Sequence, residues 1–286
     1  RSWDKDSIRV NAQIRISSKS RDRLAMLEKR SRVSIYMNQD FADIKTVVEE
    51  STLAKEWRNI KNMATLGGDQ IEVTYVVDVP STAKLEINNR FGNTYINNHT
   101  GRISLTSEHG DVRLGKVLQL EQADVSFGKL FAREVDRPDL DLSFCDLDIS
   151  KARSLRIESK SSTLHIGELT SIFMRSTRDK LTVKQVDVLD ISGSLTKVEV
   201  GKLTGQATAS LRYGKLWVQE IMPTFTSLKI RPKHCTVYLN FSNTEKVKTT
   251  IKGEDISIDY DRGMGELKKN GYQYEGYLGS TESQGK

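Results

Sequence analysis

One motif of about eighteen residues recurs along more than half of the chain. Each copy holds an apolar pair, a turn residue that we call the anchor, and a second apolar pair, as in LEINNRFGNTYI at 85–96 and ATASLRYGKLWV at 207–218. Ten copies are found, the fourth with one residue deleted, and a period this regular indicates stacked repeats. The anchors are Gly92, Gly110, Gly128, Asp146, Ser162, Asp179, Thr196, Gly214, Cys235 and Glu254.

Within each copy, apolar residues alternate with polar ones. Leu85 and Ile87 precede the first anchor, and Thr94 and Ile96 follow it. This two-residue period is typical of half-buried strands, so each copy predicts a strand, a turn and a second strand. Two short strands cannot bury an apolar face alone, whereas stacked equal units build a continuous core. We therefore predict an all-β parallel β-helix, or β-solenoid, of about ten coils. An antiparallel sandwich is the alternative, but it does not require the repeats to match in register.

The glycine anchors predict a positive φ at the corner between the two strands, a conformation that other residues adopt only with strain. In the middle copies the anchor is Asp146, Ser162, Asp179 or Thr196 instead. We expect a more ordinary turn at these four positions.

The pattern divides the chain into three parts. Residues 1–80 predict a small α+β cap, residues 81–260 the β-solenoid, and residues 261–286 a C-terminal cap and tail. A cap is expected because the terminal coil of a solenoid otherwise exposes an unpaired strand edge. In the N-terminal part we expect strands at 7–16, 32–37, 42–51 and 69–80, a loop around 59–68, and a short amphipathic helix within 17–30 that starts at Ser18 or Ser20. At the other end Tyr272, Tyr274 and Tyr277 are expected to fold over the last coil, and residues from Ser280 onward to be disordered.

Charge and hydropathy exclude several classes of protein. The net charge is +6 and the pI about 9.1, but acidic residues are interspersed with basic ones nearly everywhere, so we predict no nucleic-acid partner. No apolar run approaches the roughly 18 residues that a membrane span requires, and the first ten residues hold no signal-peptide core. We predict a chain that is folded almost throughout and has no transmembrane segment.

Motifs for catalysis and metal binding are not found in the sequence. There is no G-x-S-x-G, Walker, H-E-x-x-H or Cys-x-x-Cys pattern. The histidines, which are His99, His109, His165 and His234, have no metal-ligand spacing and are expected in surface turns. The position that follows the anchor holds acids only near opposite ends of the array, at Asp111 and Asp255, so no carboxylate pair is predicted there. We predict no enzyme activity and no cofactor.

That same position forms a basic column in the later copies. Lys180, Lys197 and Lys215 fall on consecutive coils, about 4.8 Å apart by the spacing of strands in a sheet. Like charges at this distance repel unless the side chains splay into water. Splayed, solvated lysines are one interpretation, and a ladder for an anionic glycan or surface polymer is the other.

A second column is expected to point outward and to bring Trp217 beside Tyr238 on adjacent coils. Exposed aromatic rings are a common platform for sugar rings or for a protein partner. The alternative is that a cap or another subunit covers them. The predicted column comprises Tyr95, Arg113, Phe131, Asp148, His165, Thr182, Glu199, Trp217, Tyr238 and Ser257.

The two cysteines, Cys145 and Cys235, belong to the fourth and ninth copies. Five coils separate them by about 24 Å along the axis, whereas a disulfide requires Cα atoms within about 7 Å. We predict two free thiols.

The repeat units NRFGNTYI, SFGKLFA and LRYGKLWV, the segment IEVTYVVDVPSTAKLEINNRFGN and the closing YEGYLG resemble the exported bacterial adhesin-like β-solenoids, which are related to the head-GIN type. The resemblance covers essentially the whole chain. It implies a right-handed parallel β-helix located in the periplasm or on the cell surface of a Gram-negative bacterium. It brings no catalytic motif to this chain.

Residues and resemblance together predict a non-catalytic, exported surface or periplasmic protein. Its ligand is expected to be a glycan, an envelope polymer or a protein, and the candidate ligand-binding residues are Trp217, Tyr238, Lys180, Lys197 and Lys215. Because parallel β-helices also carry polysaccharide lyases and hydrolases, the alternative function is a carbohydrate-active enzyme.

Overall fold

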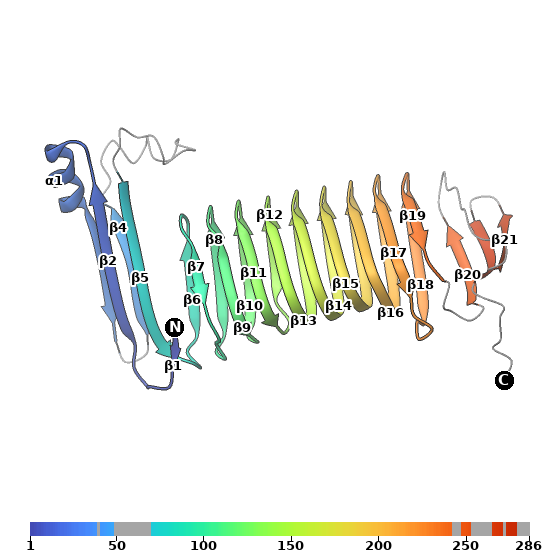
Figure 1. Cartoon of the computed structure of the whole chain (residues 1–286), viewed down its shortest axis with the longest axis horizontal. Coiled ribbons are helices and arrows are strands. Elements are labelled where there is room, and N and C mark those ends of the chain that lie inside the picture. The colour runs from blue at the N-terminus through green and yellow to red at the C-terminus, as the bar shows by residue number, and fades with distance from the viewer. Residues whose placement is uncertain (39–40, 49–69, 242–246, 253–264, 271–272, 279–286) are drawn as a thin grey trace. The chain divides into compact units, whose positions relative to one another are not determined.

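The computed structural model describes residues 1–38, 41–48, 70–241, 247–252, 265–270 and 273–278. The chain divides into two compact units, Arg1–Pro80 and Ser81–Lys286. Nearly all described residues with regular structure are in strands, and α1 (Arg21–Arg30) is the helix that interrupts them (Figure 1). The predicted all-β class is therefore confirmed.

The N-terminal unit combines strands with one helix, as predicted. Strand β2 (Arg9–Ser17) pairs antiparallel with β5 (Gln70–Pro80), β1 (Ser2–Trp3) lies parallel to β5, and β3 (Ser31–Met37) forms a hairpin with β4 (Ala42–Val48). Helix α1 begins at its N-cap Ser20, whose hydroxyl accepts a hydrogen bond from the backbone N–H of Arg23 at 3.4 Å. The loop expected around 59–68 lies outside the described residues.

The second unit contains a β-solenoid of about nine turns, whose strands pair in parallel with their counterparts one turn away (Figure 1). Each turn of the solenoid has two long faces, which meet at the anchor in a sharp bend that we call the tight turn. The A face, which precedes the tight turn, consists of β6 (Leu85–Asn89), β8 (Ile103–Glu108), β10 (Leu120–Ser126), β12 (Asp139–Ser143), β18 (Ser227–Lys233) and the C-terminal parts of β13 (Asp146–Lys160), β14 (Thr163–Thr177), β15 (Lys180–Ser194) and β16 (Lys197–Arg212). The B face, which follows the tight turn, consists of β7 (Thr94–Ile96), β9 (Val112–Val117), β11 (Lys129–Val135), β17 (Lys215–Ile221), β19 (Thr236–Leu239) and the N-terminal parts of β13 to β16.

The core is a set of apolar columns that run along the solenoid between the two faces. On the B face, Leu130, Leu147 and Leu164 lie in register on successive turns and are at most 1% exposed. Strict alternation of buried and exposed residues produces these columns, as expected for strands with one face in the core. The outward residues between them form equally regular columns, which determines what the surface presents.

The prediction that the tenth copy forms a turn of the solenoid is wrong. Strand β20 (Val247–Lys252) pairs antiparallel with β22 (Gln273–Leu278), which also pairs with β21 (Gly265–Asn270). These strands form a separate three-stranded sheet. The sequence did not reveal this, because the alternation in VKTTIK suits antiparallel and parallel pairing equally well. Tyr274 and Tyr277 belong to β22, whereas Tyr272 and the residues from Ser280 onward lie outside the described residues.

The predicted role of glycine at the corner is correct only at Gly92, which has φ +126°. In the later turns the residue before the anchor takes the left-handed conformation, for example Phe127 with φ 55°. The Gly128 anchor is required for a different reason: a Cβ there would lie 2.1 Å from the carbonyl oxygen of Gly110 in the preceding turn. The glycine thus permits close approach of two backbones.

The alignment of the fourth copy also needs correction. Lys129 pairs with Asp146, so the anchor of that turn is Cys145 and no residue is deleted. Where an anchor carries a side chain, it points into the interior and bonds to neighbouring turns. The Ser162 hydroxyl accepts a hydrogen bond from the N–H of Cys145, and the Asp179 carboxylate accepts one from the N–H of Ser162. The turns are therefore not more ordinary in the middle copies; their anchor side chains add hydrogen bonds to the backbone hydrogen bonds that join successive turns, such as Lys180 N–H to the Ser162 carbonyl.

Candidate functional site

The predicted basic column is present on the B face. Parallel pairing places Lys180 opposite Lys197, and Lys197 opposite Lys215. Lys180 and Lys197 are exposed. Lys215 is half-buried because its ammonium nitrogen lies 4.0 Å from the centre of the Trp217 ring. The three cations therefore line one edge of the B face, and the last of them contacts the aromatic column.

The predicted aromatic neighbours also lie together. Trp217 pairs with Tyr238 across the last two B-face strands, with ring centroids 5.1 Å apart and planes inclined at 57°. Their exposed fractions are 38% and 49%, so both rings are accessible. The column itself follows the predicted order up to Tyr238, and Ser257 lies outside the described residues. Its described members are Tyr95, Arg113, Phe131, Asp148, His165, Thr182, Glu199, Trp217 and Tyr238.

An aromatic ladder at the tight turns was missed from the sequence. The rings of Phe91, His109, Phe127 and Phe144 stack on successive turns, with centroid distances of 5.4, 4.9 and 5.3 Å. Stacked rings add roughly 0.5–1.5 kcal/mol per pair beyond the burial of their area. The signal was in the sequence, because each ring stands one residue before an anchor, as in RFG, EHG, SFG and SFC.

A carboxylate column on the A face was also missed. Asp124 pairs with Asp141, Asp141 with Glu158, and Glu158 with Arg175. The prediction of no carboxylate pair concerned only the position after the anchor, on the B face, and did not extend to this column. Of the two acids predicted at that position, Asp255 lies outside the described residues, whereas the A face does bring carboxylates together.

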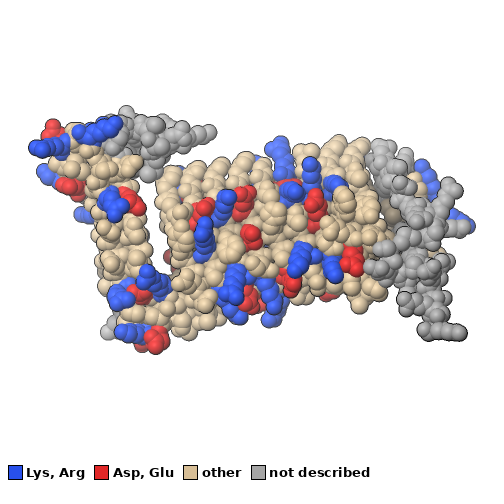
Figure 2. Space-filling model, in the orientation of Figure 1, with Lys and Arg blue, Asp and Glu red and all other residues tan. Residues whose placement is uncertain are grey.

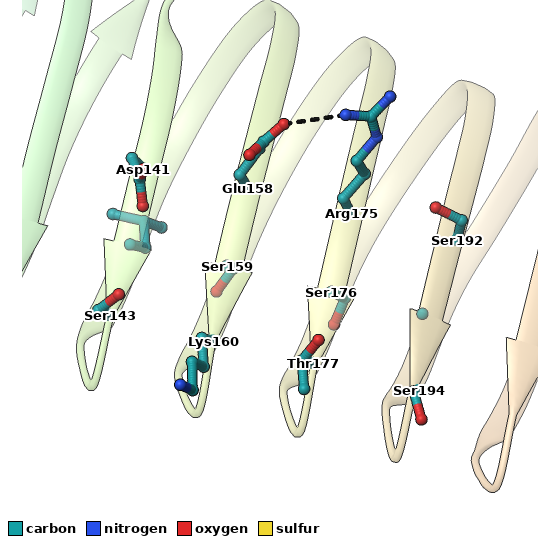
Figure 3. A pocket seen from close by; sticks show the side chains of 12 residues that line it. Asp141, Ser143, Glu158, Ser159, Lys160, Arg175, Ser176, Thr177, Ser192 and Ser194 are labelled. Atoms are coloured by element: carbon teal, nitrogen blue, oxygen red, sulfur yellow. Dashed lines mark hydrogen bonds and ion pairs between the residues drawn. The ribbon is translucent and has the colours of Figure 1, made fainter.

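This column borders a shallow, open hollow of about 540 Å³ (Figure 3). Asp141, Glu158, Arg175 and Ser192 project from neighbouring strands along it, and an ion pair of 3.2 Å joins Glu158 to Arg175. Partial desolvation raises the pKa of Asp141 above its ordinary value although the residue is exposed, and the charges of Asp124 and Glu158 add to this. Within the described ranges, no three His, Cys, Asp or Glu side chains form a metal-ligand group.

The histidines occupy three kinds of position. His109 and His234 are at tight turns, and His165 lies on the B face, all exposed. The expectation of a surface turn is wrong for His165, which is exposed but lies within strand β14. It is also wrong for His99, which is only 2% exposed and lies 2.7 Å from the carbonyl oxygen of Ala83 through its Nε2 atom.

Both cysteines are free, as predicted. They occupy equivalent anchor positions, and the Cys235 sulfur accepts a hydrogen bond from the N–H of Gly214. Cys145 is buried, and this burial raises the pKa of its thiol.

The charged residues on the face seen in Figure 2 are intermixed, so this face of the solenoid shows no single sign of charge. In the part of the chain that the structure describes, no helix has both the length and the apolar character needed to cross a bilayer.

Comparison with protein-family models, curated proteins and solved structures found no match to this chain. The surface geometry and the family resemblance are therefore the basis of the functional proposal.

Proposed function

We propose that this protein is a non-catalytic, exported β-solenoid that binds a glycan or envelope polymer along the B face. Export to the periplasm or cell surface rests on the resemblance to adhesin-like solenoids. Fractionation of cells that produce the natural protein checks it, because recovery in the cytosol would contradict export.

The observation that carries this proposal is the cluster of Trp217, Tyr238 and Lys215. Two accessible rings lie 5.1 Å apart beside an ammonium group that contacts one of them. Exposed rings of this kind provide flat apolar area for the C–H faces of sugar rings, and the neighbouring cation suits a carboxylate or sulfate substituent. Because the cluster is built on strands of a packed solenoid, binding requires little ordering of the protein.

The first prediction is that Trp217→Ala weakens glycan binding by at least about tenfold, since hot-spot aromatics at interfaces contribute 2 kcal/mol or more. A glycan array identifies a ligand, and titration calorimetry then measures the affinity of the wild type and the variant. Phe131→Ala is the matched control, because Phe131 is an exposed ring in the same column on an earlier turn. Equal affinity of wild type and Trp217→Ala for every bound glycan would contradict the proposal.

A second candidate function, a glycoside hydrolase or lyase, is favoured by the A-face carboxylates. Adjacent parallel strands lie about 4.8 Å apart, close to the roughly 5–5.5 Å that separates the carboxyl groups of retaining glycosidases. The raised pKa of Asp141 is the property that a general acid requires, and a second carboxyl group, that of Glu158, lies one turn away. Against this candidate, Glu158 is ion-paired with Arg175 and the hollow is open to solvent.

The second prediction follows from the non-catalytic proposal: the wild-type protein releases no oligosaccharide from neutral or acidic polysaccharides. Reducing-sugar assays and chromatography of the products measure this. If release were seen and Asp141→Asn abolished it while Asp139→Asn did not, the enzyme candidate would replace the proposed function.

A further inference from the structure

The last two turns of the solenoid carry an excess of positive charge. Residues 206–240 hold five basic side chains and one acidic side chain. The acidic one, Glu220, is ion-paired at 3.4 Å with Lys202 of the preceding turn. The basic residues are Arg212, Lys215, Lys229, Arg231 and Lys233. This region therefore differs from the intermixed charge of the earlier turns.

Strand pairing gathers four of the five basic residues on the A face, before the tight turn. On the A face Arg212 lies opposite Lys233, while Lys229 and Arg231 alternate outward along the adjacent strand. Arg212, Lys229 and Arg231 are exposed, and none of them pairs with a carboxylate in the part of the chain that the structure describes. Cations on neighbouring strands repel one another, so a bound polyanion would lower their electrostatic energy.

Aromatic rings continue this basic surface around the turn to the B face. Tyr213 follows Arg212 at the tight turn, and its ring stacks on that of His234 at 5.0 Å. Lys215 and Trp217 come next on the B face. We call this surface the basic band; it comprises Arg212, Tyr213, Lys215, Trp217, Lys229, Arg231 and Tyr238.

We propose that the basic band binds an acidic polysaccharide, whose carboxylate or sulfate groups pair with cations from both faces. This inference rests on the proposed function and specifies its ligand: the polymer is anionic, and the site extends around the turn to A-face residues outside the predicted set. Arginine suits this role because its planar guanidinium group pairs with carboxylate and sulfate oxygens through two N–H donors.

The arrangement of the rings favours an acidic polysaccharide over a single-stranded nucleic acid. Nucleic-acid binding surfaces need open ring faces on which successive bases stack. Here the two rings at the tight turn, Tyr213 and His234, stack on each other with planes only 9° apart, so each ring covers one face of the other. An acidic polysaccharide needs mainly a series of cations along its path, which the basic band supplies.

The test uses the full chain with four probes, which are polygalacturonate, dextran sulfate, neutral dextran and oligothymidylate. The variant Arg212→Ala/Lys229→Ala/Arg231→Ala removes three charges from the basic band. At about 0.1 M salt we expect it to bind the preferred anionic polysaccharide about tenfold more weakly than the wild type, because each exposed charge pair contributes about 1.4- to 5-fold to the affinity and the three contributions multiply. The two anionic polysaccharides distinguish a carboxylate ligand from a sulfate ligand.

The matched control is Arg133→Ala/Lys151→Ala/Lys160→Ala, which removes three exposed charges from earlier turns. We expect its affinity to change by less than about twofold, since exposed charges farther away than about 10 Å are screened. Circular dichroism checks that each variant is folded, and Arg212→Gln/Arg231→Gln replaces the triple variant if that one is not.

Four outcomes would overturn the inference. Equal losses in the two triple variants would mean that only net charge matters. Equal affinity of the wild type for neutral dextran and both anionic polysaccharides would exclude a polyanion site, although a polysaccharide-binding function would stand. Tighter binding of oligothymidylate than of either acidic polysaccharide would indicate a nucleic-acid site. If no polysaccharide from the glycan array or from these probes binds, the proposed function fails together with the inference.

Discussion

Asp141 illustrates how stacking changes the chemistry of a single residue. Its carboxylate lies between Asp124 and Glu158 on adjacent turns, and it has no ion-pair partner in the described part of the chain. Desolvation and the two like charges raise its pKa above 3.8. An acid whose pKa is raised by folding is ionised at a cost to the folded state. That cost is present above the raised pKa, decreases as the pH falls through it, and vanishes below about the unfolded value of 3.8.

The third prediction is that Asp141→Asn stabilises the protein at pH 7 by up to about 1 kcal/mol, a small effect because the side chain is exposed. The gain should disappear below about pH 3.8, where the wild-type carboxyl is protonated in both states. Thermal unfolding at several pH values measures it. Asp139→Asn is the control and should give no gain in stability, because the Asp139 carboxylate forms an ion pair with Arg156, with 3.6 Å between Oδ1 and Nε. A loss of stability in Asp141→Asn at pH 7 would contradict the argument.

Outward columns could be predicted from the sequence wherever the repeat register was known. Trp217 and Tyr238 lie side by side for this reason, as do Lys197 and Lys215. The A-face acids follow the same rule and were missed because one position of the repeat was searched. The orientation of Lys215 over the Trp217 ring is a matter of side-chain packing, which periodicity does not specify.

The tight turn is the element that fixes the register of the solenoid. In the described turns, each anchor from Gly110 onward is preceded by a residue with positive φ, beginning with His109, and these φ values lie between 52° and 62°. Sequence alone indicated where the turns are, but not which residue adopts this conformation. Glycine is ambiguous, because it serves both positive φ and close backbone approach.

The fourth prediction concerns this close approach. Gly128→Ala would place a methyl group about 2.1 Å from the carbonyl oxygen of Gly110, so one of two hydrogen-bonded backbones must move. We expect a loss of about 3 kcal/mol in the free energy of unfolding, at the upper end of overpacking effects. Urea denaturation followed by circular dichroism measures this loss. The control, Gly193→Ala, should cost less, because its nearest atom is the Thr196 hydroxyl at 3.0 Å. If the two variants were equally stable, close approach would not explain the glycine anchor.

At the scale of the whole molecule, the solenoid followed from the repeat, whereas its end did not. Nine copies share one register, whereas the first strand of the tenth belongs to an antiparallel sheet. This difference could not be predicted, because strand alternation does not encode the direction of pairing. The number of turns between two residues then determines their distance along the axis. Cys145 and Cys235 provide a chemical measure of that number, since both occupy the anchor position.

The last prediction is that the denatured, unreduced protein contains two free thiols. Five turns at about 4.8 Å separate Cys145 from Cys235 by roughly 24 Å, far beyond the 7 Å or so that a disulfide allows between Cα atoms. In the native protein Cys145 should react slowly, because it is buried, its pKa is raised, and its thiol donates a hydrogen bond of 2.8 Å to the carbonyl of Val125.

Titration with a chromogenic disulfide reagent before and after unfolding measures both expectations. In the Cys235→Ser variant the single remaining thiol should become reactive only on unfolding, which assigns the slow reaction to Cys145. Because equivalent anchors on different turns cannot meet, an intramolecular bridge between the two cysteines would require a different number of turns between them. Such a bridge would therefore refute the register on which every outward column, including the basic band, depends.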